Sequence, residues 1–121
     1  QASPHNYMDL FNKAKKAFET KGPAYINVIS PCVPGWKYPP HLTIKMAKLA
    51  VETCFWPLVE IERGKWKLNF DPGDNKKPIT EWIKHQKRFK HIFKPENKHI
   101  LDEFPAHVDL KWDLYKKRCQ L

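Results

Sequence analysis

The sequence predicts an α/β fold in which residues 1–35 end a parallel-sheet module and residues 36–121 form an α+β extension with a β-hairpin and helices. Three observations support this prediction. A helical pattern stops at Gly22-Pro23 and leads into an apolar stretch, which is typical of an α/β unit. Apolar and charged residues alternate over residues 58–70, as they do in a hairpin. The stretches that follow carry the apolar periodicity of helices.

The first helix is expected at residues 7–20, because apolar residues recur there at helical spacing. They are Tyr7, Phe11, Ala14 and Phe18. Lys13 lies off this apolar stripe. Asn6 is a candidate N-cap, and Gly22 with Pro23 ends the helix because glycine suits the C′ position and proline cannot continue a helix.

A short, largely buried strand is expected at residues 24–29. A parallel strand of this kind needs neighbours on both sides, and the sequence offers no second parallel strand. Residues 30–40 follow as an irregular loop, because four prolines and a glycine exclude helix and ladder there. The loop leaves the C-terminal end of the strand, which is where open α/β sheets place their ligands.

A second helix is expected at residues 43–53. Its stripe consists of Ile44, Ala47, Val51 and Cys54. Residues 58–70 predict a hairpin that turns at Arg63-Gly64 with one apolar face and one charge-matched face. The expected pairs are Val59 with Leu68, Glu60 with Lys67, Ile61 with Trp66 and Glu62 with Lys65.

Beyond a turn at residues 71–75, a third helix is expected at residues 79–89. A short helical piece is expected at residues 97–104, broken at Pro105. The last helix is expected at residues 106–118. Its apolar face consists of Val108, Trp112 and Tyr115.

Composition indicates a folded protein of a single domain or part of one. Apolar residues make up 41% of the 121 residues, far above the level of a disordered chain. The net charge of +9 suits an acidic partner, although charge alone favours an ordinary solvated basic surface. No apolar run approaches the ~20 residues of a membrane span, and no secretory signal pattern is visible. Three widely spaced cysteines fit a reducing compartment, so we expect a cytoplasmic protein.

Cys32 is the candidate metal ligand, because it lies in the proline-rich loop beyond a strand end. The alternative is an inert, small apolar residue. An iron–sulfur or zinc site needs about four ligands, and the sequence has no Cys-x-x-Cys, so any partners of Cys32 would lie outside this chain. Cys54 is expected in the core, and Cys119 is expected to have no role.

No catalytic residue can be named from the sequence, since it has no nucleophile elbow, phosphate loop or dinucleotide fingerprint. The six histidines show no metal-site spacing. Basic and aromatic residues alternate over residues 82–93. They could bind nucleic acid, and an ordinary amphipathic helix explains them equally well.

Several motifs, taken together and in order, are similar to one protein family. They are Gly22-Pro23-Ala24-Tyr25-Ile26, Ser30-Pro31-Cys32-x-x-Gly35-Trp36, Ala47-x-Leu49-Ala50-Val51-Glu52-Thr53 with Trp56-Pro57-Leu58, and Lys77-Pro78-Ile79 leading to Gln86-x-Arg88-Phe89. Over residues 3–89, and more faintly in the last helix, the sequence resembles the C-terminal region of the beta subunits of pyruvate:ferredoxin oxidoreductases, also called pyruvate synthases.

The resemblance implies an enzyme that oxidatively decarboxylates pyruvate, transfers the acetyl group to coenzyme A and passes electrons through 4Fe–4S clusters to ferredoxin. Thiamine diphosphate, held with Mg²⁺, forms the carbanion intermediate in that family. By resemblance, residues 1–35 end the thiamine-diphosphate-binding α/β module. Cys32 is by resemblance the fourth ligand of the 4Fe–4S cluster nearest to thiamine, and the other three cysteines belong to upstream sequence.

The sequence departs from the family in lacking the upstream Cys-x-x-Cys and the Gly-Asp-Gly…Asn element that holds Mg²⁺ and the diphosphate. We therefore expect this chain alone to bind neither cofactor and to be inactive. The expected partners are the remainder of the beta subunit, the other oxidoreductase subunits, ferredoxin, pyruvate and coenzyme A, with no nucleic acid and no membrane. The alternatives are a stand-alone basic module that binds nucleic acid, or the same family acting on another 2-oxoacid.

Overall fold

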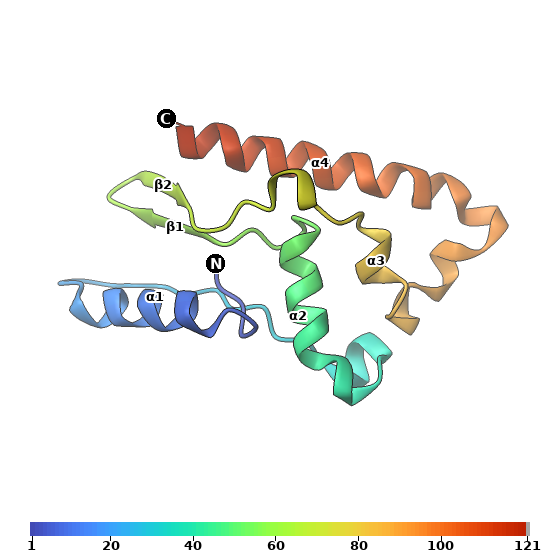
Figure 1. Ribbon diagram of the computed structural model, residues 1–121, viewed down its shortest axis with the longest axis horizontal. Coiled ribbons are helices and arrows are strands. Elements are labelled where there is room, and N and C mark those ends of the chain that lie inside the picture. Colours follow the sequence, from blue (N-terminus) through green and yellow to red (C-terminus); the bar gives the residue numbers. More distant parts are fainter. Residues whose placement is uncertain (121) are drawn as a thin grey trace.

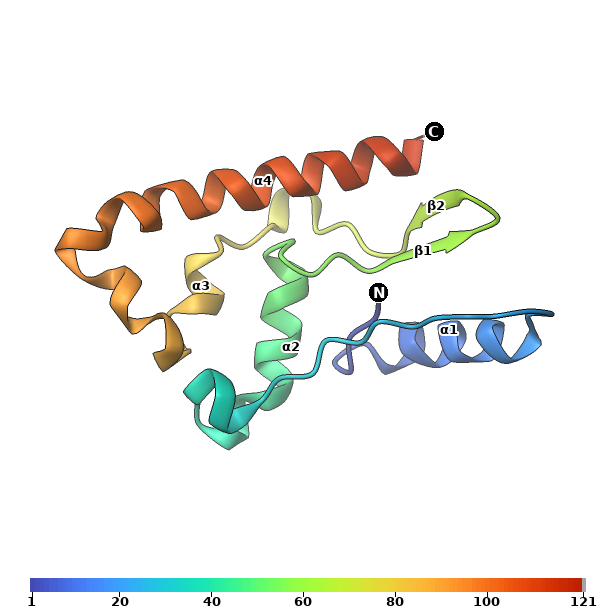
Figure 2. The same cartoon turned by 180° about the vertical axis from the view of Figure 1, so that it is seen from behind.

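The computed structural model describes residues 1–120 as helices arranged around one small antiparallel sheet (Figure 1). The helices are α1 (Tyr7–Glu19), α2 (Thr43–Glu52), α3 (Thr80–Ile83) and α4 (Lys98–Gln120), and the strands are β1 (Val59–Glu62) and β2 (Lys65–Leu68). Short 3₁₀ turns lie at Pro40–Leu42, Gly73–Asn75, Lys87–Phe93 and Pro95–Asn97, and one π-helical turn lies at Val33–Lys37. Both views place the hairpin between α1 and α4, with α2 crossing beneath α4 (Figures 1 and 2).

The hairpin forms in the predicted register. Its pairs are Val59 with Leu68, Glu60 with Lys67, Ile61 with Trp66 and Glu62 with Lys65. Arg63 and Gly64 both adopt positive φ, 50° and 79°, which is the backbone of the type I′ turn whose twist matches that of paired strands. The charge-matched face and the apolar face are therefore confirmed.

The core lies where α2, α3 and the first half of α4 meet. Its buried members are Ile29, Tyr38, Met46, Leu49, Ala50, Ile79, Trp82, Ile83 and Val108. Trp82 is 1% exposed, and its indole nitrogen donates to the Met46 carbonyl oxygen at 2.9 Å, which ties α3 to α2. Its ring packs on Phe55, with centroids 4.4 Å apart, and meets Trp36 edge-on at 5.6 Å.

Helix α1 forms as predicted, but it presents the opposite face to the molecule. Asn6 caps it by accepting from the Asp9 amide at 3.2 Å. The apolar stripe faces outward, since Phe11 is 61% and Phe18 is 93% exposed. Lys13, placed off the stripe by its spacing, is the buried residue of the helix. The apolar stripe of α1 is thus left uncovered within residues 1–120.

The strand predicted at residues 24–29 is not formed. The segment is extended, but its sheet-like pairing is limited to one parallel bridge between Val28 and Ala2. The expected burial is also wrong, because Tyr25 is 85% exposed and Ile29 is the buried residue of the segment. A strand needs a hydrogen-bonded neighbour along its length, and within residues 1–120 this segment meets only the short stretch around Ala2.

Two other helix predictions differ from the structure. The helix expected at residues 79–89 stops after Ile83, because Gln86 is extended (φ −108°, ψ 110°), and a 3₁₀ turn follows. The break predicted at Pro105 does not occur, and α4 continues through it. Loss of one backbone donor is tolerated there because Phe104 packs against the core before Pro105, and Val108 and Trp112 are buried after it.

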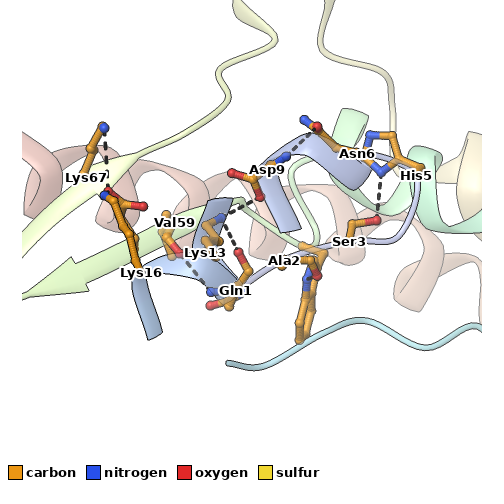
Figure 3. A network of polar contacts seen from close by, with 12 residues as sticks. Gln1, Ala2, Ser3, His5, Asn6, Asp9, Lys13, Lys16, Val59 and Lys67 are labelled. Carbon is orange, nitrogen blue, oxygen red and sulfur yellow. Dashed lines mark hydrogen bonds and ion pairs between the residues drawn. The ribbon is translucent and has the colours of Figure 1, made fainter. Parts of the chain in front are cut away.

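The first residues of the chain fasten α1 to the rest of the molecule (Figure 3). Lys13 donates to the Gln1 carbonyl oxygen and to Asp9 Oδ2, both at 2.7 Å. The main-chain nitrogen of Gln1 donates to the Val59 carbonyl oxygen at 2.8 Å, and the Trp56 indole donates to that of Ala2 at 2.9 Å. The polar face of α1 is therefore held by a buried network and not by apolar packing.

A charged contact adds to this attachment. Lys16 on α1 and Lys67 on β2 both approach Glu60 Oε1, at 2.7 and 3.6 Å (Figure 3). Burial opposes ionisation of Glu60, but the hydrogen bond and charge of Lys16, with the charge of Lys67, outweigh it and lower the pKa of this carboxyl.

Replacing Trp82 by Phe tests the central packing. Trp82→Phe removes the indole donor to Met46 and leaves part of a filled site empty, so we expect a loss of about 2–3 kcal/mol in the free energy of unfolding. Urea denaturation of the chain followed by circular dichroism measures it. Trp112→Phe is the matched control, because Trp112 is also buried and its ring nitrogen has no hydrogen bond within residues 1–120. Equal losses in the two variants would contradict the role given to the indole hydrogen bond.

Candidate functional site

Cys32 lies at the start of a tight loop on the surface. Its thiol is exposed, and the Trp36 amide donates to its carbonyl oxygen at 2.8 Å, four residues back, at the start of the π-helical turn Val33–Lys37. The loop predicted as irregular over residues 30–40 therefore contains this turn and a 3₁₀ turn at Pro40–Leu42. Because the turn fixes the backbone around it, the exposed sulfur is presented in a defined position.

Gly35 leaves space beside the sulfur. A Cβ atom at this position would lie 3.0 Å from Cys32 Sγ, which is tighter than most real Cβ contacts and would crowd the sulfur. Thiolate sulfur is a soft ligand that suits iron–sulfur clusters and zinc. An exposed sulfur with an open side toward Gly35 fits a single metal-ligating position. Within residues 1–120, no group of three or more His, Cys, Asp or Glu residues could hold a metal ion, so this chain offers one ligand and no complete site.

The loop is anchored to the core through its aromatic residues. Trp36 meets Trp82 edge-on, and Tyr38, which is buried, donates its hydroxyl to Thr43 Oγ1 at 3.3 Å. Edge-to-face aromatic pairs contribute roughly 0.5–1.5 kcal/mol beyond burial. The position of Cys32 is therefore coupled to the packing of α2 and α3.

Arg88 reaches the same loop from a distant part of the sequence. Its guanidinium lies over the Trp36 ring, 4.3 Å from the centroid, and over the Phe89 ring at 4.6 Å. Its Nε donates to Gln86 Oε1 at 2.8 Å. Burial lowers the pKa of Arg88, and the neighbouring Cys32 sulfur opposes that effect. Two motifs that carry the family resemblance, residues 30–36 and 86–89, thus meet in space.

Reasoning from the sequence did not identify Arg88 as part of this site. Its position in an alternation of basic and aromatic residues gave no sign of what it contacts. The signal that could have found it is the Gln86-x-Arg88-Phe89 motif, because a glutamine two residues before an arginine can orient it once the helix ends before the glutamine.

The other two cysteines do not join Cys32. Cys54 is 2% exposed and follows the end of α2 with φ 61°, so its assignment to the core is confirmed. Burial raises the pKa of its thiol to about 12, which keeps it protonated at neutral pH. Cys119 lies in the last turn of α4, and burial raises the pKa of its thiol as well.

Three lysines of the basic and aromatic stretch at residues 82–93 are on the surface. Lys84 pairs with Glu81 at 2.8 Å, while Lys87 and Lys90 are exposed. The helices of residues 1–120 include none that is both long and apolar enough to cross a membrane.

The relatives found by comparison with known proteins all belong to one family of oxidoreductase subunits. No protein-family model matches the chain. It is 41% identical over 113 residues to pyruvate synthase subunit PorB of Thermotoga maritima, covering 93% of this chain and 35% of that protein. It is 45% identical over 84 residues to PorB of Methanocaldococcus jannaschii, covering 69% of this chain and 28% of the relative. It is 39% identical over 114 residues to ketoisovalerate oxidoreductase subunit VorB of Pyrococcus abyssi, covering 93% of this chain and 35% of the relative.

The chain therefore spans about a third of the length of these relatives, 35% in two of the three. The region that it matches is their C-terminal part. The similarity extends over nearly all of the chain in two of the comparisons, and it includes the Cys32 loop and the segment that carries Arg88. The chain belongs to the family of pyruvate synthase subunit PorB and ketoisovalerate oxidoreductase subunit VorB.

Proposed function

We propose that this chain is the C-terminal part of the beta subunit of a pyruvate:ferredoxin oxidoreductase. The observation that carries the proposal is the 41% identity over 113 residues to pyruvate synthase subunit PorB. The complete cytoplasmic enzyme converts pyruvate and coenzyme A into acetyl-CoA and CO₂ and delivers the two electrons released to ferredoxin. Thiamine diphosphate with Mg²⁺ and 4Fe–4S clusters supply the carbanion and electron-transfer chemistry when they are bound in that enzyme.

The second candidate is the same reaction on a branched 2-oxoacid. It is favoured by the 39% identity to ketoisovalerate oxidoreductase subunit VorB over 114 residues, which nearly equals the match to PorB. Residues that distinguish a methyl from an isopropyl group must touch the substrate, and the two similarities do not single out such residues. An activity assay with both substrates is therefore needed to decide between the two candidate functions.

In the proposed enzyme, Cys32 supplies the fourth ligand of one 4Fe–4S cluster. Its exposed sulfur and the open space toward Gly35 support this role, as does the lack of further ligands around it within the described chain. A 4Fe–4S cluster that is held by three cysteines of the upstream sequence needs one further soft ligand, and the Cys32 thiolate is such a ligand. The chain alone binds no cluster, no thiamine diphosphate and no Mg²⁺.

Residues 1–35 complete the thiamine-diphosphate-binding α/β module in this proposal, and residues 36–121 form the extension that packs on it and on other subunits. The outward face of α1 and the extended segment support the division. They expose Tyr7, Met8, Phe11, Phe18, Tyr25 and Val28 on one part of the molecule. Exposed apolar patches of this kind mark interaction surfaces, and a parallel sheet in the rest of the subunit would cover them.

Ferredoxin is the proposed electron acceptor, and the net charge of +9 supports it. Ferredoxin docking on a basic surface is favoured by charge complementarity, which acts mainly on the association rate. Lys37 in the Cys32 loop and Lys87 and Lys90 on either side of Arg88 are exposed, whereas Lys84 is partly neutralised by Glu81.

The assembled enzyme should reduce ferredoxin with pyruvate and coenzyme A. Because a larger side chain must fit a site built for a methyl group, we expect kcat/KM for 2-ketoisovalerate to be at least about tenfold lower than for pyruvate. Steady-state kinetics with both substrates measures this. The reverse preference would establish the second candidate, and no reduction with either 2-oxoacid would refute the proposed function.

Cys32→Ser in the assembled enzyme should lower the iron content by up to one cluster or change the electron paramagnetic resonance signal of one cluster. Serine is a harder ligand than thiolate, so that cluster should also become less stable toward oxygen. Bound thiamine diphosphate should stay at the level of the unsubstituted enzyme. Cys119→Ser is the control, because it removes a thiol at the far end of α4. Full iron content with an unchanged signal in Cys32→Ser would refute the proposal that Cys32 ligates a cluster.

The double substitution Phe18→Ser with Tyr25→Ser tests the covered face. In the isolated chain both side chains are exposed, so the free energy of unfolding should change by no more than about 0.5 kcal/mol. In the complete subunit each loses a buried contact, and the thermal midpoint should fall by several degrees. Leu110→Ser, at a position 59% exposed on α4, is the matched control. If the double variant were as stable as the control in the complete subunit, the rest of the subunit would not cover this face, and the prediction would be wrong.

A further inference from the structure

Arg88 carries a positive charge that residues 1–120 do not neutralise. Within residues 1–120, no carboxylate lies within ion-pair distance of the guanidinium, although ten other ion pairs occur there. The side chain is half-buried between aromatic rings. Withdrawing a charge from water without a counter-ion is unfavourable, so such an arginine is expected to face an anionic group.

The orientation of this charge is fixed from both sides. Gln86 is 1% exposed, accepts from Arg88 Nε through Oε1 and donates through Nε2 to the Trp82 carbonyl oxygen at 3.0 Å. The Trp36 ring, 4.3 Å away, supports one face of the guanidinium. Since the Trp36 amide also holds the Cys32 carbonyl oxygen, the arginine and the cysteine are positioned by the same short turn.

We propose that Arg88 is a positioning residue for the anionic centre that Cys32 ligates, and that its charge raises the reduction potential of that centre. The inference rests on the proposed function, because it requires a cluster at Cys32. A cluster held by thiolates is anionic, and its reduction adds one further negative charge. A fixed cation nearby stabilises the reduced form more than the oxidised form, and such charges are among the factors that set cluster potentials.

Arginine is needed for the geometry and the charge together. The planar guanidinium stacks on Trp36 while its Nε binds Gln86, whereas the ammonium of a lysine cannot do both. Lysine at this position would keep the charge but lose the fixed orientation, and glutamine would keep a polar group but lose the charge. The two substitutions therefore separate the electrostatic role from the structural one.

The test compares Arg88→Gln and Arg88→Lys in the assembled enzyme. The readouts are iron content and the midpoint potential, from a redox titration followed by electron paramagnetic resonance, of the cluster whose signal Cys32→Ser alters. We expect Arg88→Gln to keep full iron content and to shift this midpoint to a more negative potential, and Arg88→Lys to shift it less. Arg118→Gln is the matched control, because Arg118 also stacks on an indole, that of Trp66 at 5.0 Å, at the opposite end of the molecule. It should leave the midpoint unchanged.

Two results would overturn the role of Arg88 while leaving the ligand assignment in place. One is an unchanged midpoint in Arg88→Gln, and the other is a loss of iron in Arg88→Gln and Arg88→Lys alike, which would give Arg88 a purely structural role. If Cys32→Ser altered no cluster signal, the proposed ligand would fail first and Arg88 would lose its anionic partner. The serine variant thus separates failure of the proposed function from failure of this inference.

Discussion

The indole of Trp82 is the contact on which most of the described structure depends. Its nitrogen binds a main-chain oxygen of α2, and its ring touches Trp36 from the Cys32 loop, Phe55 after α2 and Phe89 beside Arg88. One side chain therefore links the two halves of the candidate site to the helix between them. A fold with only a two-stranded sheet has few main-chain bonds between distant segments, so aromatic packing takes their place.

The sequence was sufficient for features that depend on local chemistry. Alternating residues fixed the hairpin pairing, because a slip by one residue would turn Ile61 and Trp66 to the charged face. Asn6 identified the start of α1, because a side-chain oxygen before an apolar stripe is the usual way to satisfy the first helical amides. Cys54 was assigned to the core from its apolar surroundings alone.

The remaining features depend on contacts that sequence patterns do not contain. The spacing of the α1 stripe does not say which face is covered, and Lys13 is the side that faces the molecule, because an ammonium that finds two oxygen partners can be buried. Pro105 was expected to end a helix, yet packing on both sides carries α4 through it. Cys32 was identified through family resemblance, whereas Arg88 was missed because its relation to Cys32 exists only after residues 36 and 88 meet.

The attachment of α1 by Gln1, Ala2 and Lys13 also determines when this helix can take its place during folding. Its docking partners come much later in the chain. Trp56 is 54 positions after Ala2, Val59 is 58 positions after Gln1, and Tyr115, which binds the Gln1 side chain, is 114 positions after it. Contacts of such long range form late, because the intervening chain must first lose its freedom. During synthesis on the ribosome, the polar face of α1 with Lys13 therefore stays undocked until the hairpin has emerged.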